Sequence, residues 1–573
     1  MENKDNLRIN LVYSFFALLF VVIGIRIFYL QILQNPFLKN LASRQYYRLV
    51  PLEGRRGDIF DRTGKVLATG MNSYSVFADP VMVKDAGKTA GILAANLSLP
   101  AGEIYRKLAK NKKGRFVWIK RKVSWFDKER IKKINLKGIG FIREEKRFYP
   151  QEMLASSVLG IVDVDNKGLE GMEVFYDNYL RGKNGIVRVL QDSHCREIIV
   201  SPQVITPQEG SDIVLTIDAQ LQYWVENYLA ETVRKFAASA GSVVVMDATT
   251  GEILSLANYP AFDPNSIDAA SAKYLKNRAV CDMFEPGSVF KIVTLIAALD
   301  TKRYGETDTF FCENGLFKIP GATLHDWKPY GTLSFREVFK KSSNIGVGKI
   351  ANGVGKEFIY SYIKKLRFGE KTGIDLPGEE DGSVKPLERW SKTTPYMVPI
   401  GQEVGVNILQ LVRAIAVVAN GGYLVKPHLL KSISGQNIYK DSESVKEYVL
   451  PPSTVEKAKD ILISVVADGT GKLAAVDGIR IGGKTGTAQK FDFQLGRYSP
   501  SRYRANFVGF IDYSTVPLAM GITIDEPQKS HFGGVVAASL FKQIAQKCVK
   551  YLDGRSAFAK NEVKKDFSVV VAE

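Results

Sequence analysis

The sequence predicts an α+β protein with one membrane-spanning helix, a β-rich domain and a C-terminal domain in which helices cover an antiparallel sheet. Three observations support this prediction. Residues Ile9 to Ile25 carry no charge, which is typical of a membrane helix. Short strands and glycine turns dominate residues 34–210. After residue 211, strand pairs are flanked by apolar helices, a pattern typical of a sheet with helices packed on it.

The start of the chain is expected to form a short stub, residues 1–8, and a membrane anchor, residues 9–33. The 17 uncharged residues span about 25 Å as a helix, and extension to Leu33 gives the length needed to cross a bilayer. A cleaved signal peptide is the alternative, but no small-residue cleavage site follows the apolar run. The charges of the first ten residues nearly balance, so they do not decide the orientation.

Residues 34–210 are expected to form a non-catalytic pedestal domain. Its recognisable features are glycines and charged residues at turns, such as Arg56–Asp58, which suit a scaffold. The stretch Arg106–Lys137 contains 14 lysines and arginines against two acidic residues and supplies most of the net charge of +18. Such a stretch is typical of a solvated face, and also of proteins that bind anionic lipid, an acidic polymer or nucleic acid. The membrane segment argues against nucleic acid.

Residues 211–555 are expected to form the C-terminal domain, followed by a polar tail over residues 556–573. Apolar alternation predicts four strands and a closing helix. These are the strands Gly241–Asp247, Glu252–Leu256, Ala505–Ile511 and Leu518–Ile524, and the helix Val535–Leu552. A chain of 573 residues exceeds a single core, so two or three domains are expected.

Three short strings in the C-terminal domain carry the chemistry. They are Ser288-Val289-Phe290-Lys291, Ser342-Ser343-Asn344 and Lys484-Thr485-Gly486-Thr487, the second starting 54 and the third 196 residues after Ser288. Each string alone also suits an ordinary helix, turn or hairpin. Together, in this order, they supply a nucleophile, a proton acceptor, a relaying hydroxyl, an amide and an electropositive strand. The combination predicts an acyl-transfer site that uses no histidine base.

Ser288 is expected at the N-terminus of a buried helix, because Pro286 and Gly287 precede it and an apolar run follows. Lys291 then lies one turn further along the same face. A lysine amine accepts a proton only when burial or nearby positive charge lowers its pKa. A buried helix and a second lysine, Lys484, provide both conditions.

Ser342 and Asn344 follow Ser334-Phe335-Arg336-Glu337, which reads as a capping box that starts a helix. The Ser-Ser-Asn string is therefore expected in the loop that closes this helix. The Ser342 hydroxyl can pass a proton to a leaving amine, and the Asn344 amide can hold a substrate carbonyl.

The third string is expected on a strand, where Gly486 marks close approach of another backbone, namely that of an extended peptide lying along the exposed strand edge. Lys484, Thr485 and Thr487 would meet a carboxylate. The backbone N–H groups of Ser288 and Thr487 are candidate donors to an oxyanion.

With these residues, the chain resembles the class B penicillin-binding proteins, which are peptidoglycan D,D-transpeptidases, and most closely their division-specific branch. The resemblance spans nearly the whole chain. It also includes the segments Arg55–Arg62, Arg147–Pro150, Gly168–Gly171, Leu215–Asp218 and Gly533-Gly534. Val289 and Asn407 depart from the residues common in the family, but neither supplies a reacting group.

The resemblance implies a penicillin-binding, serine β-lactamase-like fold and a set of residue roles. Ser288 would attack the D-Ala-D-Ala bond of a stem peptide, with Lys291, Ser342 and Lys484 moving protons. Asn344, Thr485, Gly486 and Thr487 would bind the peptide, and a second stem would form the cross-link. β-Lactams would acylate Ser288. The implied setting is the cytoplasmic membrane of a dividing cell, with the catalytic domain outside and a membrane-embedded glycan polymerase and division proteins as partners. A sporulation or elongation role stays open.

Two other functions remain as alternatives. A carboxypeptidase or β-lactamase needs a group that activates water, and Glu403 and Asn407 have a suggestive spacing within a poorly matching context. A β-lactam sensor or inert scaffold is disfavoured because the catalytic set is intact.

No metal site and no cofactor are expected, because the four histidines are scattered and His194-Cys195 has no second pair. The four cysteines, Cys195, Cys281, Cys312 and Cys548, have no close paired spacings. We expect them to be free buried thiols.

Overall fold

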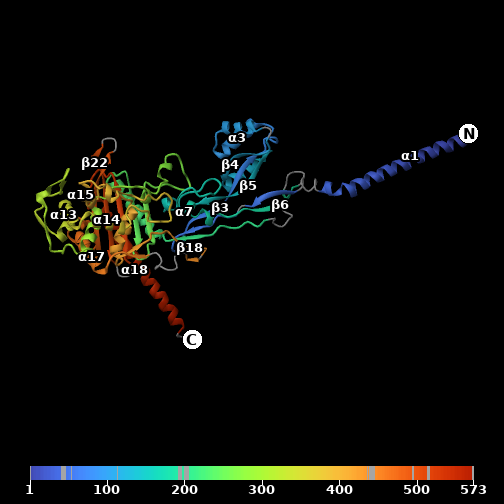
Figure 1. Cartoon of the computed structure of the whole chain (residues 1–573). Helices are drawn as coiled ribbons and strands as arrows, with labels where there is room; N and C mark the ends of the chain where they lie inside the picture. Colours follow the sequence, from blue (N-terminus) through green and yellow to red (C-terminus); the bar gives the residue numbers. More distant parts are fainter. Residues whose placement is uncertain are drawn as a thin grey trace. The chain divides into compact units, whose positions relative to one another are not determined.

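The protein is described here by a computed structural model. It describes residues 2–39, 47–52, 54–111, 114–191, 197–198, 205–434, 436–437, 446–492, 496–512 and 516–570. The chain divides into two compact units. The first consists of Met1–Arg55 with Gly182–Gly210, and the second of Arg56–Arg181 with Ser211–Glu573 (Figure 1).

The first unit contains the expected anchor helix. Helix α1 covers Glu2–Phe28 and continues as the π-helical turn η1, Tyr29–Leu33. Within the described residues, Asn6–Leu33 is the one helical segment long and apolar enough to cross a membrane, with a mean hydropathy of 2.4. The same unit contains an antiparallel sheet of β1 (Tyr47–Leu52), β6 (Gly185–Gln191) and β7 (Glu197–Ile198).

The second unit begins with a mixed sheet that combines early and late parts of the chain. The long strand β3 (Val66–Ala78) pairs with β4 (Val117–Val123) and β5 (Ile139–Phe148). The sheet continues in the order β2 (Ile59–Phe60), β8 (Ile213–Leu215), β18 (Leu430–Ile433) and β19 (Gln436–Asn437). Helices α3 (Ala86–Leu97), α4 (Ala101–Lys110) and α5 (Trp125–Ile134) bury an apolar cluster against β3 and β4.

The second sheet carries the third motif. It is antiparallel, in the order β10 (Ile253–Tyr259), β9 (Ala240–Asp247), β23 (Leu518–Asp525), β22 (Arg497–Asp512) and β21 (Arg480–Asp492). The four predicted strands are therefore confirmed, and so is the predicted strand around Lys484. Because β21 pairs only with β22 among the described strands, its other side is a sheet edge, as the extended-peptide prediction requires.

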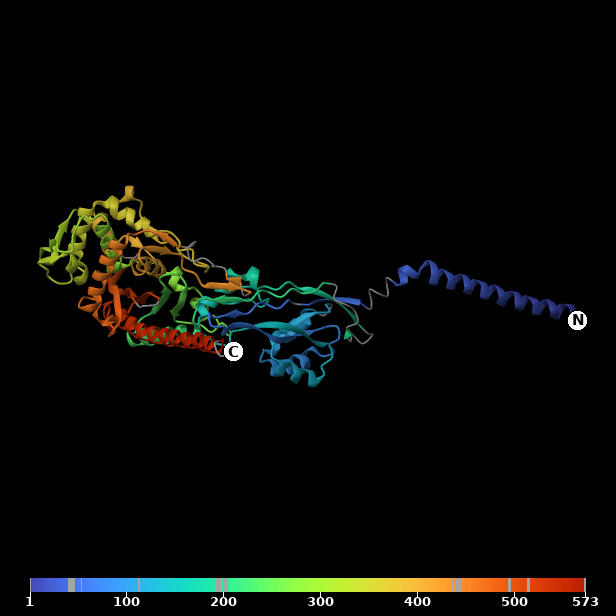
Figure 2. The ribbon, with the colours of Figure 1, turned by 90° about the horizontal axis from the view of Figure 1, so that it is seen from below.

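Helices cover both faces of this sheet, which confirms the predicted fold class. On one face, α9 (Ala219–Lys235) and α18 (Val536–Val570) pack on alternate residues such as Val243, Phe507 and Ile522. Helix α18 starts one residue after the predicted position and runs beyond Leu552 and beyond the sheet (Figures 1 and 2). The charged residues that follow Leu552 include many good helix formers, lysine, glutamate and alanine.

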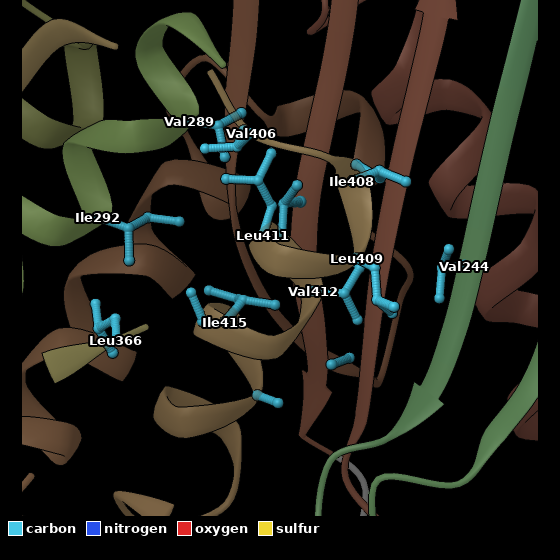
Figure 3. Close-up of a cluster of buried hydrophobic side chains, with 14 of the residues drawn as sticks. Val244, Val289, Ile292, Leu366, Val406, Ile408, Leu409, Leu411, Val412 and Ile415 are labelled. Atoms are coloured by element: carbon cyan, nitrogen blue, oxygen red, sulfur yellow. The ribbon is translucent and has the colours of Figure 1, made fainter. Parts of the chain in front are cut away.

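The other face packs on α16 (Ile408–Ala419), a helix whose every residue is buried. Leu409 and Val412 of α16 lie toward the strands, near Val244 of β9 (Figure 3). Ile415 lies on the side of Ile292, which belongs to helix α11, Lys291–Asp300 (Figure 3). Helix α16 is thus buried on all sides, as expected for an almost wholly apolar helix. It is a central layer between the sheet and α11.

The remaining elements of the second unit are short or lie around α11. The helices that surround or follow it are α12 (Phe335–Lys341), α13 (Asn344–Val354), α14 (Lys356–Lys365) and α17 (Pro452–Ala467). The shortest α-helices are α6 (Ser156–Leu159), α7 (Gly171–Phe175), α8 (Asp177–Leu180), α10 (Arg278–Cys281) and α15 (Thr394–Met397). The 3₁₀ turns are η2 (Ala272–Tyr274), η3 (Gly287–Phe290), η4 (Glu313–Gly315), η5 (Leu387–Arg389), η6 (Val398–Ile400) and η8 (Lys472–Ala474). Strand pairs form between β11 (Thr309–Phe311) and β14 (Thr332–Ser334), β12 (Leu316–Ile319) and β13 (Ala322–His325), β15 (Ser383–Val384) and β16 (Val404–Gly405), and β17 (Tyr423–Val425) and β20 (Lys446–Tyr448).

Candidate active site

The structure brings all three motifs to one place, centred on the amine of Lys291. This nitrogen lies 2.7 Å from the backbone oxygen of Ser342 and 2.7 Å from Oδ1 of Asn344. It is also 3.2 Å from Oγ of Ser342. The amine of Lys484 donates to the same Oγ at 2.8 Å. Residues separated by up to 193 positions in the chain therefore surround one hydroxyl group.

The surroundings of Lys291 suit a proton acceptor. Burial lowers the pKa of its amine to about 7, and the negative charge of Asp326 partly opposes this shift. A neutral amine has two N–H groups and one lone pair. The carbonyl oxygens of Ser342 and Asn344 can only accept, so they use both N–H groups and leave the lone pair for a hydroxyl proton.

Lys484 is also buried, and its pKa is lowered well below the ordinary value by burial and by the positive charge of Lys291. It donates to Ser342 Oγ and, at 3.2 Å, to the backbone oxygen of Thr485. The Ser342 oxygen thus has an amine on two sides, which suits a hydroxyl that relays protons.

Ser288 lies in η3, one turn before Lys291, and is half-buried. Its position at the start of a buried helix is confirmed, with the first turn in the tighter 3₁₀ form. Among the described residues its hydroxyl has no hydrogen bond, so the Lys291 amine is directed to Ser342 and Asn344 in this structure.

The turn that carries Ser288 lies against the strand that carries Lys484. A side-chain carbon at Gly486 would come 2.8 Å from the backbone oxygen of Pro286 and 2.8 Å from Cγ2 of Val289. Gly287 has a φ of +57° and donates its N–H to the backbone oxygen of Gly401 at 3.1 Å. A backbone does approach Gly486 closely, but it is that of the chain's own Pro286, whereas the prediction assigned this approach to a bound peptide. The contact places Ser288 beside the edge of β21.

The Ser-Ser-Asn string joins two helices. The capping box is confirmed, because Ser334 and Glu337 bond each other's backbone N–H at the start of α12. Ser342 ends α12 in the left-handed region, with a φ of +59°, and Ser343 caps α13 by accepting from Gly346 N–H at 2.9 Å. The prediction that the whole string lies in a loop is wrong for Asn344. With Ser343 as the N-cap, Asn344 becomes the first residue of α13.

The hydroxyls of the third string have partners of their own. Thr485 Oγ1 is 2.9 Å from Thr470 Oγ1, and Thr487 Oγ1 accepts the backbone N–H of Gly533 at 3.0 Å. The Thr487 hydroxyl can still donate its own proton, so it remains a donor for an anion. The Asn344 amide donates one N–H to the backbone oxygen of His325 at 2.7 Å and keeps a second N–H.

Sequence reasoning missed several residues of this site. The Asp326 carboxylate bonds Ser343 and the backbone of Asn344, while His325 and Thr470 orient Asn344 and Thr485. Asp326 and His325 precede the second string by 16 to 19 residues, and Thr470 precedes the third by 14, with no local motif that marks them. The sequence offered one signal, the Gly533-Gly534 pair, and that pair does lie against Thr487.

Glu403 and Asn407, the residues considered for water activation, have other partners. Glu403 accepts from Lys385 at 2.8 Å and from Thr394 at 2.9 Å. Asn407 caps α16 and is completely buried. Neither side chain bonds any of the three motifs, which removes the observation that favoured a hydrolase.

Among the cysteines, Cys312 touches the second motif, because the Ser343 hydroxyl lies 3.4 Å from its sulfur. Cys281, Cys312 and Cys548 are free and buried, as expected, while Cys195 lies outside the described residues. In the part of the chain that the structure describes, no group of three or more His, Cys, Asp or Glu side chains could hold a metal ion.

Two known protein families match this chain, one in each of its two largest parts. Residues 241–546 match the penicillin-binding protein transpeptidase domain, and residues 51–215 match the penicillin-binding protein dimerisation domain. The chain belongs to the class B penicillin-binding proteins. Its residue pattern, pedestal and helix-covered sheet are thus those of this family, as the resemblance predicted.

Relatives with established names agree with this assignment. This penicillin-binding protein is 34% identical over 98% of its length, and 88% of the relative's, to stage V sporulation protein D of Bacillus subtilis. It is 35% identical over 94% of its length, and 92% of the relative's, to a probable peptidoglycan D,D-transpeptidase PenA of Neisseria gonorrhoeae. It is 31% identical over 91% of its length, and 87% of the relative's, to the peptidoglycan D,D-transpeptidase FtsI of Escherichia coli. The chain is therefore an enzyme of the peptidoglycan D,D-transpeptidase class.

Solved structures agree at the level of the fold. Penicillin-binding protein 3 of Mycobacterium tuberculosis, complexed with aztreonam, superposes with a TM-score of 0.68 at 28% identity, over 88% of this chain and 97% of that one. A peptidoglycan synthetase of Bifidobacterium adolescentis superposes with a TM-score of 0.69 at 27% identity, over the same shares of the two chains.

Proposed function

We propose that this penicillin-binding protein cross-links peptidoglycan through a seryl acyl-enzyme on Ser288. The observation that carries the proposal is the cluster of Lys291, Ser342 and Lys484 beside the turn that holds Ser288. A buried lysine with a pKa near 7 is a base at neutral pH, and a serine needs such a base to become a nucleophile.

In the first half-reaction, Ser288 Oγ attacks the carbonyl carbon between two terminal D-alanines of a stem peptide. Its proton passes to the neutral amine of Lys291. The C–N bond then breaks, and the leaving D-alanine nitrogen takes a proton from the Ser342 hydroxyl. Ser342 regains that proton from the Lys291 and Lys484 amines that flank it.

In the second half-reaction, an amine of a neighbouring stem attacks the ester carbonyl. The C–O bond to Ser288 breaks, the amine loses a proton, and Ser288 regains one, so no proton is gained or lost overall. The backbone N–H groups of Ser288 and Thr487 stabilise the oxyanion in both steps.

The donor peptide lies along the edge of β21. Backbone groups of this edge offer strand-like pairing, and Lys484, Thr485 and Thr487 supply N–H and hydroxyl donors for a terminal carboxylate. Gly486 lets the turn that carries Ser288 approach this edge, and the second N–H of Asn344 binds a substrate carbonyl. A β-lactam occupies the same edge and acylates Ser288.

The cellular role that we propose is septal synthesis during cell division. Relatives named FtsI and PenA match this chain over more than nine-tenths of its length, and the equally extensive match to stage V sporulation protein D makes a role in sporulation the competing proposal. The apolar helix Asn6–Leu33 anchors the protein in the cytoplasmic membrane as a single pass, with the catalytic domain outside the cell. A membrane-embedded glycan polymerase and other division proteins are its partners there.

Fluorescent penicillin labelling tests the chemistry. The full-length protein in detergent is incubated with the probe, and labelling is read after denaturing electrophoresis. Wild type becomes labelled, Ser288→Ala does not, and Ser361→Ala, which removes an exposed hydroxyl of α14 that bonds the backbone oxygen of Phe358, keeps wild-type labelling. Labelling of Ser288→Ala at the wild-type rate would contradict the proposal. Rapid loss of the label from wild type would instead support a hydrolase.

Imaging tests the cellular role. In cells that carry the wild-type protein but not in Ser288→Ala cells, the additional penicillin label should collect at division septa. Label that collects only around developing spores would assign the protein to sporulation instead.

A further inference from the structure

The side chain of Asp326 binds the second motif from a distant part of the chain. It follows directly after β13, and its carboxylate is half-buried. One oxygen accepts the backbone N–H of Asn344 and, at 3.2 Å, that of Ile345. The other oxygen accepts the Ser343 hydroxyl at 2.6 Å. Three donors at the start of α13 therefore converge on one carboxylate.

These bonds stabilise the conformation of the Ser342–Asn344 segment, which has little support of its own. Ser342 is in the left-handed region between α12 and α13, a conformation that costs a non-glycine residue energy and needs support from its surroundings. The neighbouring His325 backbone oxygen takes one N–H of the Asn344 amide. That bond turns the amide oxygen toward Lys291, which it reaches at 2.7 Å.

Asp326 also sets the charge around Lys291. It is the carboxylate that acts on the Lys291 amine, and its negative charge favours the protonated form against the effect of burial. The other titratable groups near these two residues are Lys484, whose amine shares Ser342 with Lys291, and Cys312 and Tyr330, whose ionisation Asp326 disfavours. Lys349 acts on Cys312.

We propose that Asp326 is a positioning residue of the acyl-transfer reaction, which holds Ser342 and Asn344 in register with the Lys291 amine. The inference rests on the proposed function. Asp326 does not touch the substrate or the reacting atoms. It acts through its bonds to the Ser343 hydroxyl and the Asn344 backbone, and its negative charge favours the protonated form of the Lys291 amine.

Two variants separate position from charge. Asp326→Asn keeps the shape and an oxygen that accepts from Asn344, but it removes the charge. Asp326→Ala removes both. Asp308→Asn is the matched control, because Asp308 is an exposed carboxylate that bonds Gly305 in its own turn. The second-order acylation rate by fluorescent penicillin is measured from pH 5 to 9 on full-length protein in detergent. Rates are expressed per site that a saturating dose labels, so that misfolded protein does not count.

The proposal gives a different expected result for each variant. In Asp326→Asn the rise of the rate with pH moves to lower pH by at least about half a unit, because the lysine loses a neighbouring negative charge. Its maximal rate stays within about threefold of wild type. In Asp326→Ala the maximal rate per site falls at least about tenfold, since small misplacements of catalytic groups are costly. Asp308→Asn matches wild type.

Two results would overturn the inference. One is a wild-type pH profile and wild-type rate per site in both Asp326 variants. The other is a smaller number of sites in Asp326→Ala with an unchanged rate per site, which is the result of a purely structural role. A wild-type protein that penicillin does not label at all would instead refute the proposed function itself.

Discussion

In the proposed mechanism, the amine of Lys291 is the group on which the chemistry depends. A lysine buried without a carboxylate bonded to it resists protonation, and here its bonding partners are a backbone carbonyl, an amide oxygen and a hydroxyl. Its pKa of about 7 places the change from acid to base in the physiological range. A general base is most effective when its pKa lies near the working pH.

The pH dependence of acylation follows from this pKa. Because the lysine pKa is lowered, the neutral base predominates above pH 7 and the ammonium form below it. The acylation rate of wild type by penicillin should therefore fall up to about tenfold per pH unit below pH 7 and level off above about pH 8. Stopped-flow or quench measurements over pH 5 to 9 give this profile. A rate that declines as the pH rises through 7 would contradict the assignment of Lys291 as the base.

Several site residues could be predicted from sequence, and the others could not, for a physical reason. Ser288, Ser342 and Lys484 belong to strings in which the spacing itself carries chemistry, so they were predicted and the structure gathers them. Asp326 and Thr470 act by reaching across from other segments. Their positions depend on tertiary packing, which no local pattern encodes.

At the scale of elements, the site depends on the contact between η3 and β21. The turn with Ser288 has to lie against the strand with Lys484, and a glycine at position 486 permits this. The position of Val289 is fixed in turn by α11 and α16, whose buried side chains pack together with it (Figure 3). A rigid apolar layer thus sets the distance between nucleophile and strand.

Substitution of Gly486 by alanine should separate these two elements. The added carbon would lie 2.8 Å from a backbone oxygen, so the turn or the strand has to move. We expect the penicillin acylation rate of Gly486→Ala to fall about 10- to 100-fold, because a shift of about 1 Å at a catalytic centre has effects of this size. Gly91→Ala is the control, since Gly91 of α3 has nothing within 4 Å of the added carbon. Acylation of Gly486→Ala at the wild-type rate would show that the contact is unimportant.

Element prediction worked where the signal is local. The capping box of Ser334 and Glu337, the β9–β10 pair and the β22–β23 pair are all confirmed. The sequence predicted a loop after α12. It did not predict that only two residues would separate α13 from α12. This short junction depends on the Ser343 cap and on Asp326 from another segment. Strand order in the sheet was not predictable either, because β23 pairs with β9, which lies some 270 residues earlier, through long-range packing.

At the scale of the second unit, a buried ion-pair cluster joins segments that the sequence suggested as scaffold. Arg56 Nε bonds Glu173 Oε2 at 2.7 Å, and Arg147 Nε bonds Glu173 Oε1 at 2.6 Å. Arg56 also bonds Asp177 at 2.6 Å. The side chains of Glu173 and both arginines are almost fully buried. The turn at Arg56, strand β5 and helix α7 are therefore held together by one carboxylate.

Removal of that carboxylate should destabilise the protein more than it affects the chemistry. Glu173→Gln leaves two buried guanidinium groups without their shared anion, at an expected cost of about 3–5 kcal/mol in the free energy of unfolding. Asp165→Asn, which removes an exposed partner of Arg121, should cost less than about 1 kcal/mol. Thermal or urea unfolding of the full-length protein in detergent measures both. Equal stability of Glu173→Gln and wild type would show that the cluster does not hold these segments together.

The organisation of the whole chain was predictable only in outline. The apolar N-terminal helix and the antiparallel sheet with its helices are local or compositional features, and both are present. The sequence did not predict that β8 and β18 would join the sheet of β2 and β3, because these strands are short and come from distant parts of the chain. Non-local pairing of such short strands is decided by packing.

The central claim is that Ser288, and not the neighbouring Ser342, is the nucleophile. In the structure both lysine amines bond the Ser342 hydroxyl, so Ser342 is the competing candidate for the nucleophile. Proteolytic digestion and mass mapping of the benzylpenicillin-treated, full-length protein tests it most directly. We predict that the penicilloyl mass is carried by the peptide containing Ser288 and that fragment ions place it on that residue. An adduct on Ser342, with Ser288 unmodified, would contradict the account.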